Sequence, residues 1–211
     1  VPAAVGVARP RWPYLMLTAD DLDGMDWEGA KYVCSPPPRD KASQDACWIG
    51  LESGMFSLFS ADHCPFRYDD PHGKLNPAGR KSFRSVPNGI PGLETRLPNL
   101  FSEGVNKKRI SINDFVALTA TNHAKLYGLY PRKRTIAIGS DADLAIWDPV
   151  LKRTICQSML HHGADYTPYK GLEVTGWPTT IVLGGRCIVE NGIMSESEPS
   201  GEYLVRNRSS M

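Results

Sequence analysis

The chain has 211 residues, of which 41% are hydrophobic and 22% charged, a composition typical of a globular protein with a sizeable core. Its 24 basic and 23 acidic residues nearly cancel, which argues against nucleic acid or an anionic membrane surface as a partner. No run approaches the roughly 20 apolar residues that cross a bilayer, and the first residues lack the order of a secretory signal. The five cysteines are odd in number and include no Cys-x-x-Cys pair, so we expect reduced thiols in a cytoplasmic protein.

Short apolar runs alternate with helical patterns between residues 31 and 128. The expected elements are a strand at 32–35, a helix at 40–53, a strand at 56–60, a long loop and a helix at 110–129. Such alternation predicts parallel strands joined by helices, which is an α/β fold. Ser111 and Asp114 have the spacing of a capping box at the start of the last helix, and Gly128 with Pro131 marks its end.

The pattern changes from Thr135 onward to short β runs broken by turns. The expected strands are 135–139, 143–148, 179–185 and 186–194. Gly184-Gly185 and Asn191-Gly192 are typical hairpin turns, so this half is predicted to be mostly antiparallel. The polar end, residues 195–211, is expected to be an arm or a frayed tail.

Three polar residues follow the predicted strands or lie in a stiff loop after them. Asp62 comes directly after the strand at 56–60, Ser35 ends the strand at 32–35 before three prolines, and Asn88 lies in the loop Val-Pro-Asn-Gly-Ile-Pro-Gly. Catalytic residues of parallel α/β barrels gather at the carboxyl ends of strands. Asp after a strand and Pro-Asn-Gly are also ordinary turn signals, so each residue alone is a weak indication.

Five stretches in this order resemble the carboxy-terminal part of the cyclic amidohydrolases of the D-hydantoinase and dihydropyrimidinase group. They are YVCSPPPRDK, SADHCPF, VPNGIPGLETRLP, TNHAKLYGLYPRK and IAIGSDADLAIWDP. The similarity covers roughly residues 14 to 192, which is under half of a complete relative. It implies that residues 1–134 are the last strands and helices of a (β/α)8 metal-dependent hydrolase barrel. Residues 135–211 would then be the carboxy-terminal strands of a small β-sandwich with a polar tail.

The resemblance also implies an activity and a set of site residues. Asp62 matches the aspartate that binds one of two divalent metal ions, taken to be zinc, and shuttles the proton. Ser35 and Asn88 match residues whose main chain holds the cyclic diamide. Two bridged metals would activate water for ring opening of hydantoins or dihydropyrimidines to N-carbamoyl amino acids. The implied enzyme is a cytoplasmic homotetramer acting on a small molecule.

The sequence departs from this family in its metal ligands. The family's His-x-His pair, carboxylated lysine and two single histidines have no counterparts among His63, His72, His123, His161 and His162. We expect packing, turn or surface roles for these five, and we expect the 211-residue chain alone to hold no metal and to be inactive. At its start the chain reads Arg11-Trp12-Pro13-Tyr14-Leu15, where relatives resemble Thr-Cys-Pro-Gln-Tyr-Leu.

Two other readings stay open. One is a non-catalytic scaffold or fragment resembling the collapsin response mediator proteins, and the other is an allantoinase or dihydroorotase. Scaffold relatives tend to lose metal-site and ring-binding residues, whereas this chain keeps Asp62 and the Pro87-Asn88-Gly89 loop. The SADHCPF and VPNGIPG stretches resemble the corresponding motifs of hydantoinases more than those of allantoinases or dihydroorotases. The sequence therefore favours descent from a ring-opening enzyme.

Overall fold

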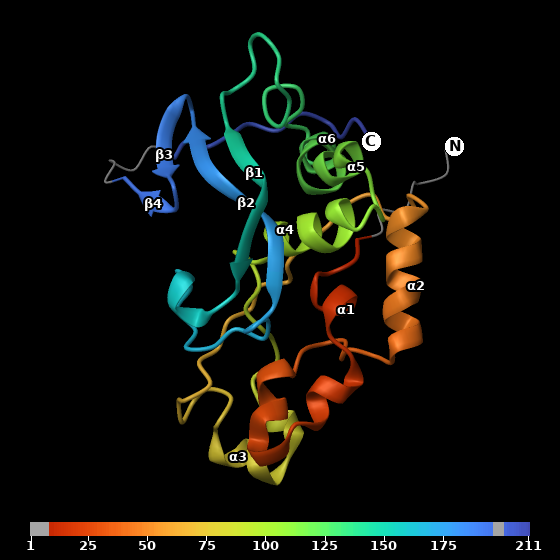
Figure 1. The fold of residues 1–211 in the computed structure, drawn as a ribbon, viewed down its shortest axis with the longest axis vertical. Helices are drawn as coiled ribbons and strands as arrows, with labels where there is room; N and C mark the ends of the chain where they lie inside the picture. Colours follow the sequence, from red (N-terminus) through yellow and green to blue (C-terminus); the bar gives the residue numbers. More distant parts are fainter. Residues whose placement is uncertain (1–8, 196–200) are drawn as a thin grey trace.

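The computed structural model describes residues 9–195 and 201–211. Helical segments precede a single four-stranded sheet along the chain (Figure 1). The helical segments are α1 (Pro13–Met16), η1 (Ala19–Asp23), η2 (Met25–Tyr32), α2 (Lys41–Glu52), α3 (Pro77–Lys81), η3 (Phe83–Ser85), α4 (Arg96–Leu100), η4 (Phe101–Asn106), α5 (Ile112–Val116), η5 (Ala117–Thr121), α6 (Asn122–Leu126) and η6 (Gln157–Met159). The strands are β1 (Leu144–Thr154), β2 (Glu173–Leu183), β3 (Arg186–Glu190) and β4 (Ile193–Met194).

The two predicted long helices are confirmed. Asp40 caps α2 by accepting a hydrogen bond from the backbone N–H of Ser43 at 2.9 Å. Ser111 and Asp114 form the predicted capping box at the start of α5, and α5, η5 and α6 follow one another without a break to Leu126. Gly128 ends this run at φ +67°, where a Cβ atom would lie 1.9 Å from the carbonyl oxygen of Asn207. The carboxy-terminal arm therefore requires glycine at this position.

The antiparallel half is confirmed except at its first strand. The four strands pair in the order β1-β2-β3-β4, and both predicted turns have the two left-handed residues of a type I′ hairpin. Residues 135–139 form turns instead of the expected strand, and Ile136 and Ile138 are exposed. A strand is stabilised by hydrogen bonds to a neighbour, and the described residues offer none to this segment.

The predicted strands at 32–35 and 56–60 are wrong as regular elements. Residues 25–32 form η2, and the second segment contributes one isolated parallel bridge between Arg11 and Ser60. A second parallel bridge joins His63 to Ile90. The parallel direction is as predicted, but a barrel strand needs a neighbour on each side, and the described chain provides only these single contacts. The predicted domain boundary after residue 134 stays a prediction.

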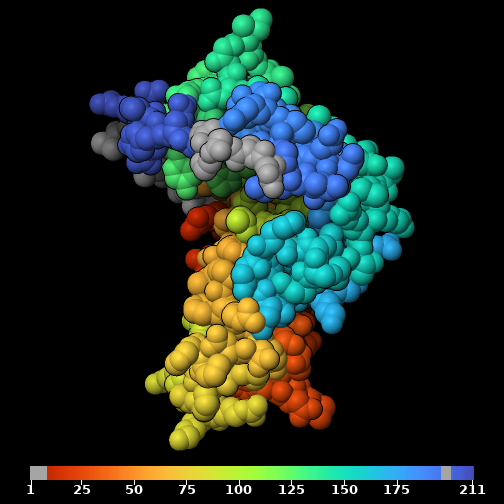
Figure 2. Space-filling model, turned by 90° about the vertical axis from the view of Figure 1, so that its left-hand side faces the viewer, coloured from red at the N-terminus to blue at the C-terminus, as the bar shows by residue number. Residues whose placement is uncertain are grey.

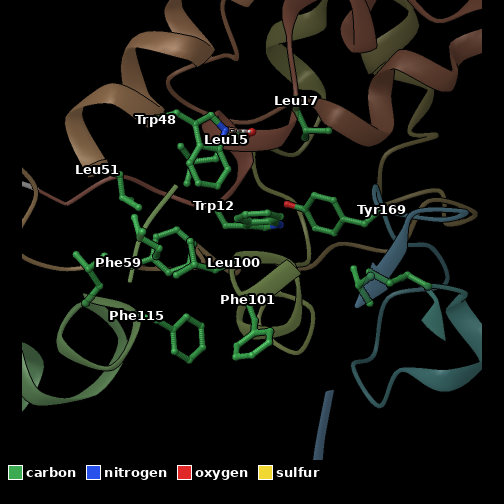
Figure 3. Close-up of a cluster of buried hydrophobic side chains, with 14 of the residues drawn as sticks. Trp12, Leu15, Leu17, Trp48, Leu51, Phe59, Leu100, Phe101, Phe115 and Tyr169 are labelled. Atoms are coloured by element: carbon green, nitrogen blue, oxygen red, sulfur yellow. Dashed lines mark hydrogen bonds between the residues drawn. The ribbon is translucent and has the colours of Figure 1, made fainter. Parts of the chain in front are cut away.

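An aromatic core joins the start of the chain to its middle and end (Figure 3). Trp12 and Phe59 are fully buried with ring centroids 6.0 Å apart, and Tyr169 lies 5.9 Å from Trp12. Trp48 reaches this cluster from α2 and donates from Nε1 to the carbonyl of Leu15 at 3.0 Å. Because Trp12 is anchored, the neighbouring residue 11 has a fixed position at the edge of the core.

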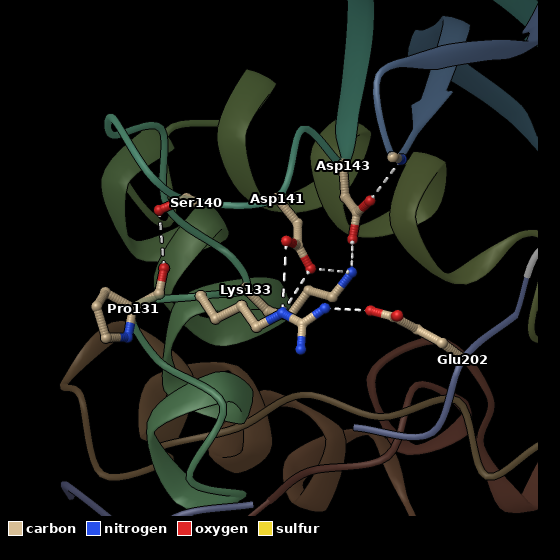
Figure 4. A network of polar contacts seen from close by, with 8 residues as sticks. Pro131, Lys133, Ser140, Asp141, Asp143 and Glu202 are labelled. Atoms are coloured by element: carbon tan, nitrogen blue, oxygen red, sulfur yellow. Dashed lines mark hydrogen bonds and ion pairs between the residues drawn. The ribbon is translucent and has the colours of Figure 1, made fainter. Parts of the chain in front are cut away.

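A second set of contacts fastens the carboxy-terminal arm (Figure 4). Lys133 pairs with Asp141 at 2.8 Å and with Asp143 at 2.7 Å, and Arg132 pairs with Asp141 and with Glu202. The backbone of the arm also binds α6 and the residues after it, so residues 201–211 are an arm and not a frayed tail; residues 196–200 of that prediction lie outside the described part. Within the described residues, no helix has the length and apolarity that a membrane span requires.

The loop that carries α3 and η3 lies at the opposite end of the molecule from α6 and the β3–β4 hairpin (Figure 1). The side view shows the same arrangement, with the yellow residues at one end and the blue and green segments at the other (Figure 2). The three predicted site residues are carried by this loop and by the two segments that precede it in the chain.

Candidate active site

The structure brings the three predicted site residues into one polar network. Asn88 donates from Nδ2 to the hydroxyl oxygen of Ser35 at 2.8 Å. Arg11 donates from Nη1 to the carbonyl oxygen of Ser35 at 2.9 Å and to Oδ2 of Asp62 at 2.7 Å. Ser35 and Asn88, 53 positions apart in the sequence, thus meet directly, and Arg11, which the sequence did not single out as a site residue, joins Ser35 to Asp62.

Asp62 has a strained backbone. Its φ of +53° is in the left-handed region, which costs a residue other than glycine of order 1–3 kcal/mol. Bonds on either side enforce this conformation: the N–H of Ser60 donates to the carbonyl of Pro10, and the N–H of Cys64 donates to the carbonyl of Ile90. Strain that is held by surrounding structure is typical of functional positions.

Asn88 presents its main chain to solvent. Within the described residues its backbone N–H and C=O take part in no hydrogen bond, while the next residue, Gly89, is buried and donates to the carbonyl of Val33 at 3.0 Å. Gly89 has φ +155°, and a Cβ atom there would lie 2.5 Å from Cβ of Cys64. The close approach of three loops therefore fixes the Asn88 peptide in place with its polar groups free for a ligand.

A cavity of about 730 Å³ borders Ser35 and Asn88. This volume suits a small organic molecule. Its remaining walls are mostly apolar: Leu22, Gly24, Trp27, Gly29, Ala30, Val33, Cys34, Pro37, Phe83, Arg84 and Val86. Asp62 is not among the lining residues and is linked to the cavity through Arg11 and Ser35.

Cys34 lies next to Ser35 and is the one thiol in the lining. Burial raises the pKa of its thiol to about 11, so the thiol stays protonated at neutral pH. A protonated thiol is a poor nucleophile. Cys34 is therefore not in the thiolate form that attacks a carbonyl group.

The histidines occupy packing and loop positions. His63, adjacent to Asp62, accepts hydrogen bonds at Nδ1 from the N–H groups of Gly92 and Leu93, at 3.1 and 3.2 Å. Burial lowers the pKa of His63, which suits a neutral acceptor. The other four histidines also form hydrogen bonds. The backbone N–H of His72 donates to Asp70, and the ring nitrogens of His123, His161 and His162 bond to the Phe59 carbonyl, the Glu94 carboxylate and the Ala164 N–H.

The described residues do not by themselves form a metal site. Residues 9–195 and 201–211 contain no group of three or more His, Cys, Asp or Glu side chains placed to hold an ion. The Asp62 carboxylate is instead paired with the Arg11 guanidinium, so a positive charge already neutralises it. One carboxylate cannot supply the three or four ligands that a catalytic divalent ion takes from a protein.

Comparison with known proteins decides the family. The model of the amidohydrolase family matches residues 39–188. The chain belongs to the amidohydrolase family. It is 43% identical over 195 residues to the D-hydantoinase of Rhizobium radiobacter, an alignment that covers 92% of this chain and 42% of that protein.

Solved structures agree with this assignment. A D-hydantoinase structure has a TM-score of 0.89 and 42% identity and matches 96% of this chain and 43% of its own. The dihydropyrimidinase from Brevibacillus agri has a TM-score of 0.84 and 41% identity, and the match covers 89% of this chain and 40% of its own. The predicted fold class, part of an amidohydrolase barrel with β strands after it, is confirmed. This chain spans about two fifths of the length of these relatives.

Two further residues of the candidate site, Arg11 and Lys74, could not be predicted from the sequence. For Arg11 the only available signal was that the stretch around it departs from the pattern of the family that the sequence resembles. Lys74 is fully buried beside Ser35 and Asn88 through its contacts with Val33 and Pro87, although it lies in a polar loop that predicts exposure. Only the folded loops show that both residues belong to the site.

Proposed function

We propose that the protein to which this chain belongs opens cyclic amide rings by hydrolysis, converting hydantoins or dihydropyrimidines to N-carbamoyl amino acids. One observation carries the proposal: Ser35, Asp62 and Asn88, chosen from the sequence, lie in a single polar network beside a cavity of about 730 Å³. The similarity to proteins named D-hydantoinase and dihydropyrimidinase supports it.

Each residue has a role that fits its surroundings. The free N–H and C=O of Asn88 form the donor and acceptor pair that an imide edge requires, and Ser35 lines the same cavity. Two such contacts would hold the ring and align its carbonyl for attack. Asp62 would take the proton of the attacking water and return it to the ring nitrogen that leaves.

The pairing with Arg11 bears on this role of Asp62. The Arg11 guanidinium binds Oδ2 of Asp62 at 2.7 Å and leaves Oδ1 of Asp62 without a partner among the described residues. Oδ2 is thus oriented, and Oδ1 is available to accept a proton from water. Arg11 would then set the direction from which Asp62 acts.

Three finer points belong to the same proposal. They are two zinc ions as the metals, a homotetramer as the assembly and the cytoplasm as the location. The resemblance supports the first two, and the five free cysteines fit a reducing compartment. The zinc ligands other than Asp62 would have to come from outside the described residues.

A chimera tests the proposal without requiring this chain to act alone. In the D-hydantoinase of Rhizobium radiobacter, the matching 42% is replaced by this chain, and hydrolysis of hydantoin and dihydrouracil is measured. We expect ring opening above the rate of the host enzyme from which the same segment has been deleted. A folded chimera with no hydrolysis of either ring would favour the scaffold reading.

A further inference from the structure

Lys74 is the one fully buried cation among the described residues, with a relative exposure of 0%. It forms no ion pair within that part of the chain. Its ammonium group instead donates to two carbonyl oxygens, that of Val33 at 2.8 Å and that of Pro87 at 2.7 Å. Burial without a carboxylate lowers the pKa of Lys74 to about 8. A methionine would fill the same space without this cost, so packing alone does not explain the lysine.

Both carbonyls lie within two residues of the ring-holding residues of the proposed site. Val33 is two residues before Ser35, and Pro87 directly precedes Asn88. The Val33 carbonyl also accepts the Gly89 N–H at 3.0 Å, so the two loops meet at this oxygen. One ammonium group thus ties the loop of Ser35 to the loop of Asn88.

The bond to Pro87 has a further effect on Asn88. The Pro87 C=O and the Asn88 N–H belong to one peptide group, which is trans and therefore points its C=O and N–H in opposite directions. With the carbonyl bound to Lys74, the Asn88 N–H is directed away from it, toward the side where the described residues offer no partner. A cation on the carbonyl also polarises the peptide, which makes that N–H a stronger donor.

We propose that Lys74 is a positioning residue that fixes and polarises the Pro87–Asn88 peptide, so that the Asn88 N–H is held ready for a carbonyl of the ring. This inference rests on the proposed function for the identity of the ligand. The tie that Lys74 makes between the two loops does not depend on the proposed function. The tie between the loops and the binding of the ring can therefore be tested separately.

The first arm measures the loops in the chain itself. Lys74→Met removes both donors at nearly constant size, and Lys81→Met, an exposed lysine on α3, is the matched control. In Lys74→Met we expect the Gly89 amide to exchange its hydrogen at least about tenfold faster, while the Phe115 amide in α5 changes less than about twofold. Unchanged exchange at Gly89, or equal acceleration at both amides, would overturn the proposal.

A second measurement serves if Lys74→Met does not fold. In the unmodified chain, NMR with ¹⁵N-labelled lysine and ¹³C-labelled carbonyls detects coupling across the hydrogen bond from Lys74 Nζ to the Pro87 carbonyl. We expect this coupling at neutral pH. Its absence in the folded chain would overturn the proposal.

The second arm uses the chimera and separates binding from chemistry. Lys74→Met should raise KM about tenfold and lower kcat less than about threefold, because Asp62 is untouched while the grip on the ring is lost. A loss confined to kcat would contradict the positioning role. If the unmodified chimera itself hydrolyses nothing, the proposed function has failed, and the exchange arm alone still decides whether Lys74 holds the loops.

Discussion

Lys74 predicts an unusual dependence of stability on pH. Its pKa of about 8 in the folded chain, against 10.5 for an ordinary lysine, means that the unfolded chain binds this proton more tightly. The buried charge therefore destabilises the fold fully below pH 8, and the penalty fades as the pH rises to 10.5. A difference of this size corresponds to about 3 kcal/mol at pH 7, of which about 2–3 kcal/mol disappears by pH 10.

Urea unfolding of the chain and of Lys74→Met isolates this effect. Between pH 7 and pH 10 the free energy of unfolding of the unmodified chain should rise by about 2–3 kcal/mol relative to that of the variant. The raised pKa of Cys34 acts in the opposite direction and is itself lowered by the Lys74 charge, so both proteins are compared in a Cys34→Ser background. Lys81→Met should show no such trend. A difference that is flat between pH 7 and 10 would refute the view that Lys74 is buried as an uncompensated cation.

Two further outcomes test the packing around the site. Gly89→Ala would place a Cβ atom 2.5 Å from Cβ of Cys64 and should lower the free energy of unfolding by about 1–3 kcal/mol. The control Gly163→Ala, with open space around it, should lower it by less than about 0.5 kcal/mol. Denaturant titration of both variants measures the two changes. Thiol labelling at pH 7 should modify exposed Cys64 well before Cys34, since Cys34 is buried with a pKa of about 11; equal rates would contradict this.

The sequence predicts those parts of the fold whose geometry depends on a few neighbouring residues. The capping box of Ser111 and Asp114 and the Asn191-Gly192 turn each fix backbone geometry by their own chemistry, so the sequence predicts them. The barrel strands differ, because the segments at 32–35 and 56–60 depend on neighbours on both sides. The described residues give the second segment a single bridge, and no regular strand forms there.

The candidate site was predicted in part for a similar reason. Asp62, Ser35 and Asn88 carry recognisable motifs, and their meeting in space followed from placing them at loop ends. Arg11 and Lys74 carry no motif, since their importance comes from tertiary contacts that span 51 and 41 positions. A lysine in a polar loop is predicted to be exposed, and only its contacts with two carbonyls show that it is buried.

The most direct test of the proposed function is the rate of ring opening by the chimera with Asp62→Asn, measured beside His63→Asn as the matched neighbour. The amide keeps the size of Asp62 but cannot accept a proton, so the rate should fall about 10³-fold or more, whereas His63→Asn should cost far less. Asn88→Ala, which keeps the backbone N–H, should fall between them. If Asp62→Asn keeps more than about a tenth of the activity in a chimera with normal metal content, Asp62 is only a turn residue and the proposed mechanism is wrong.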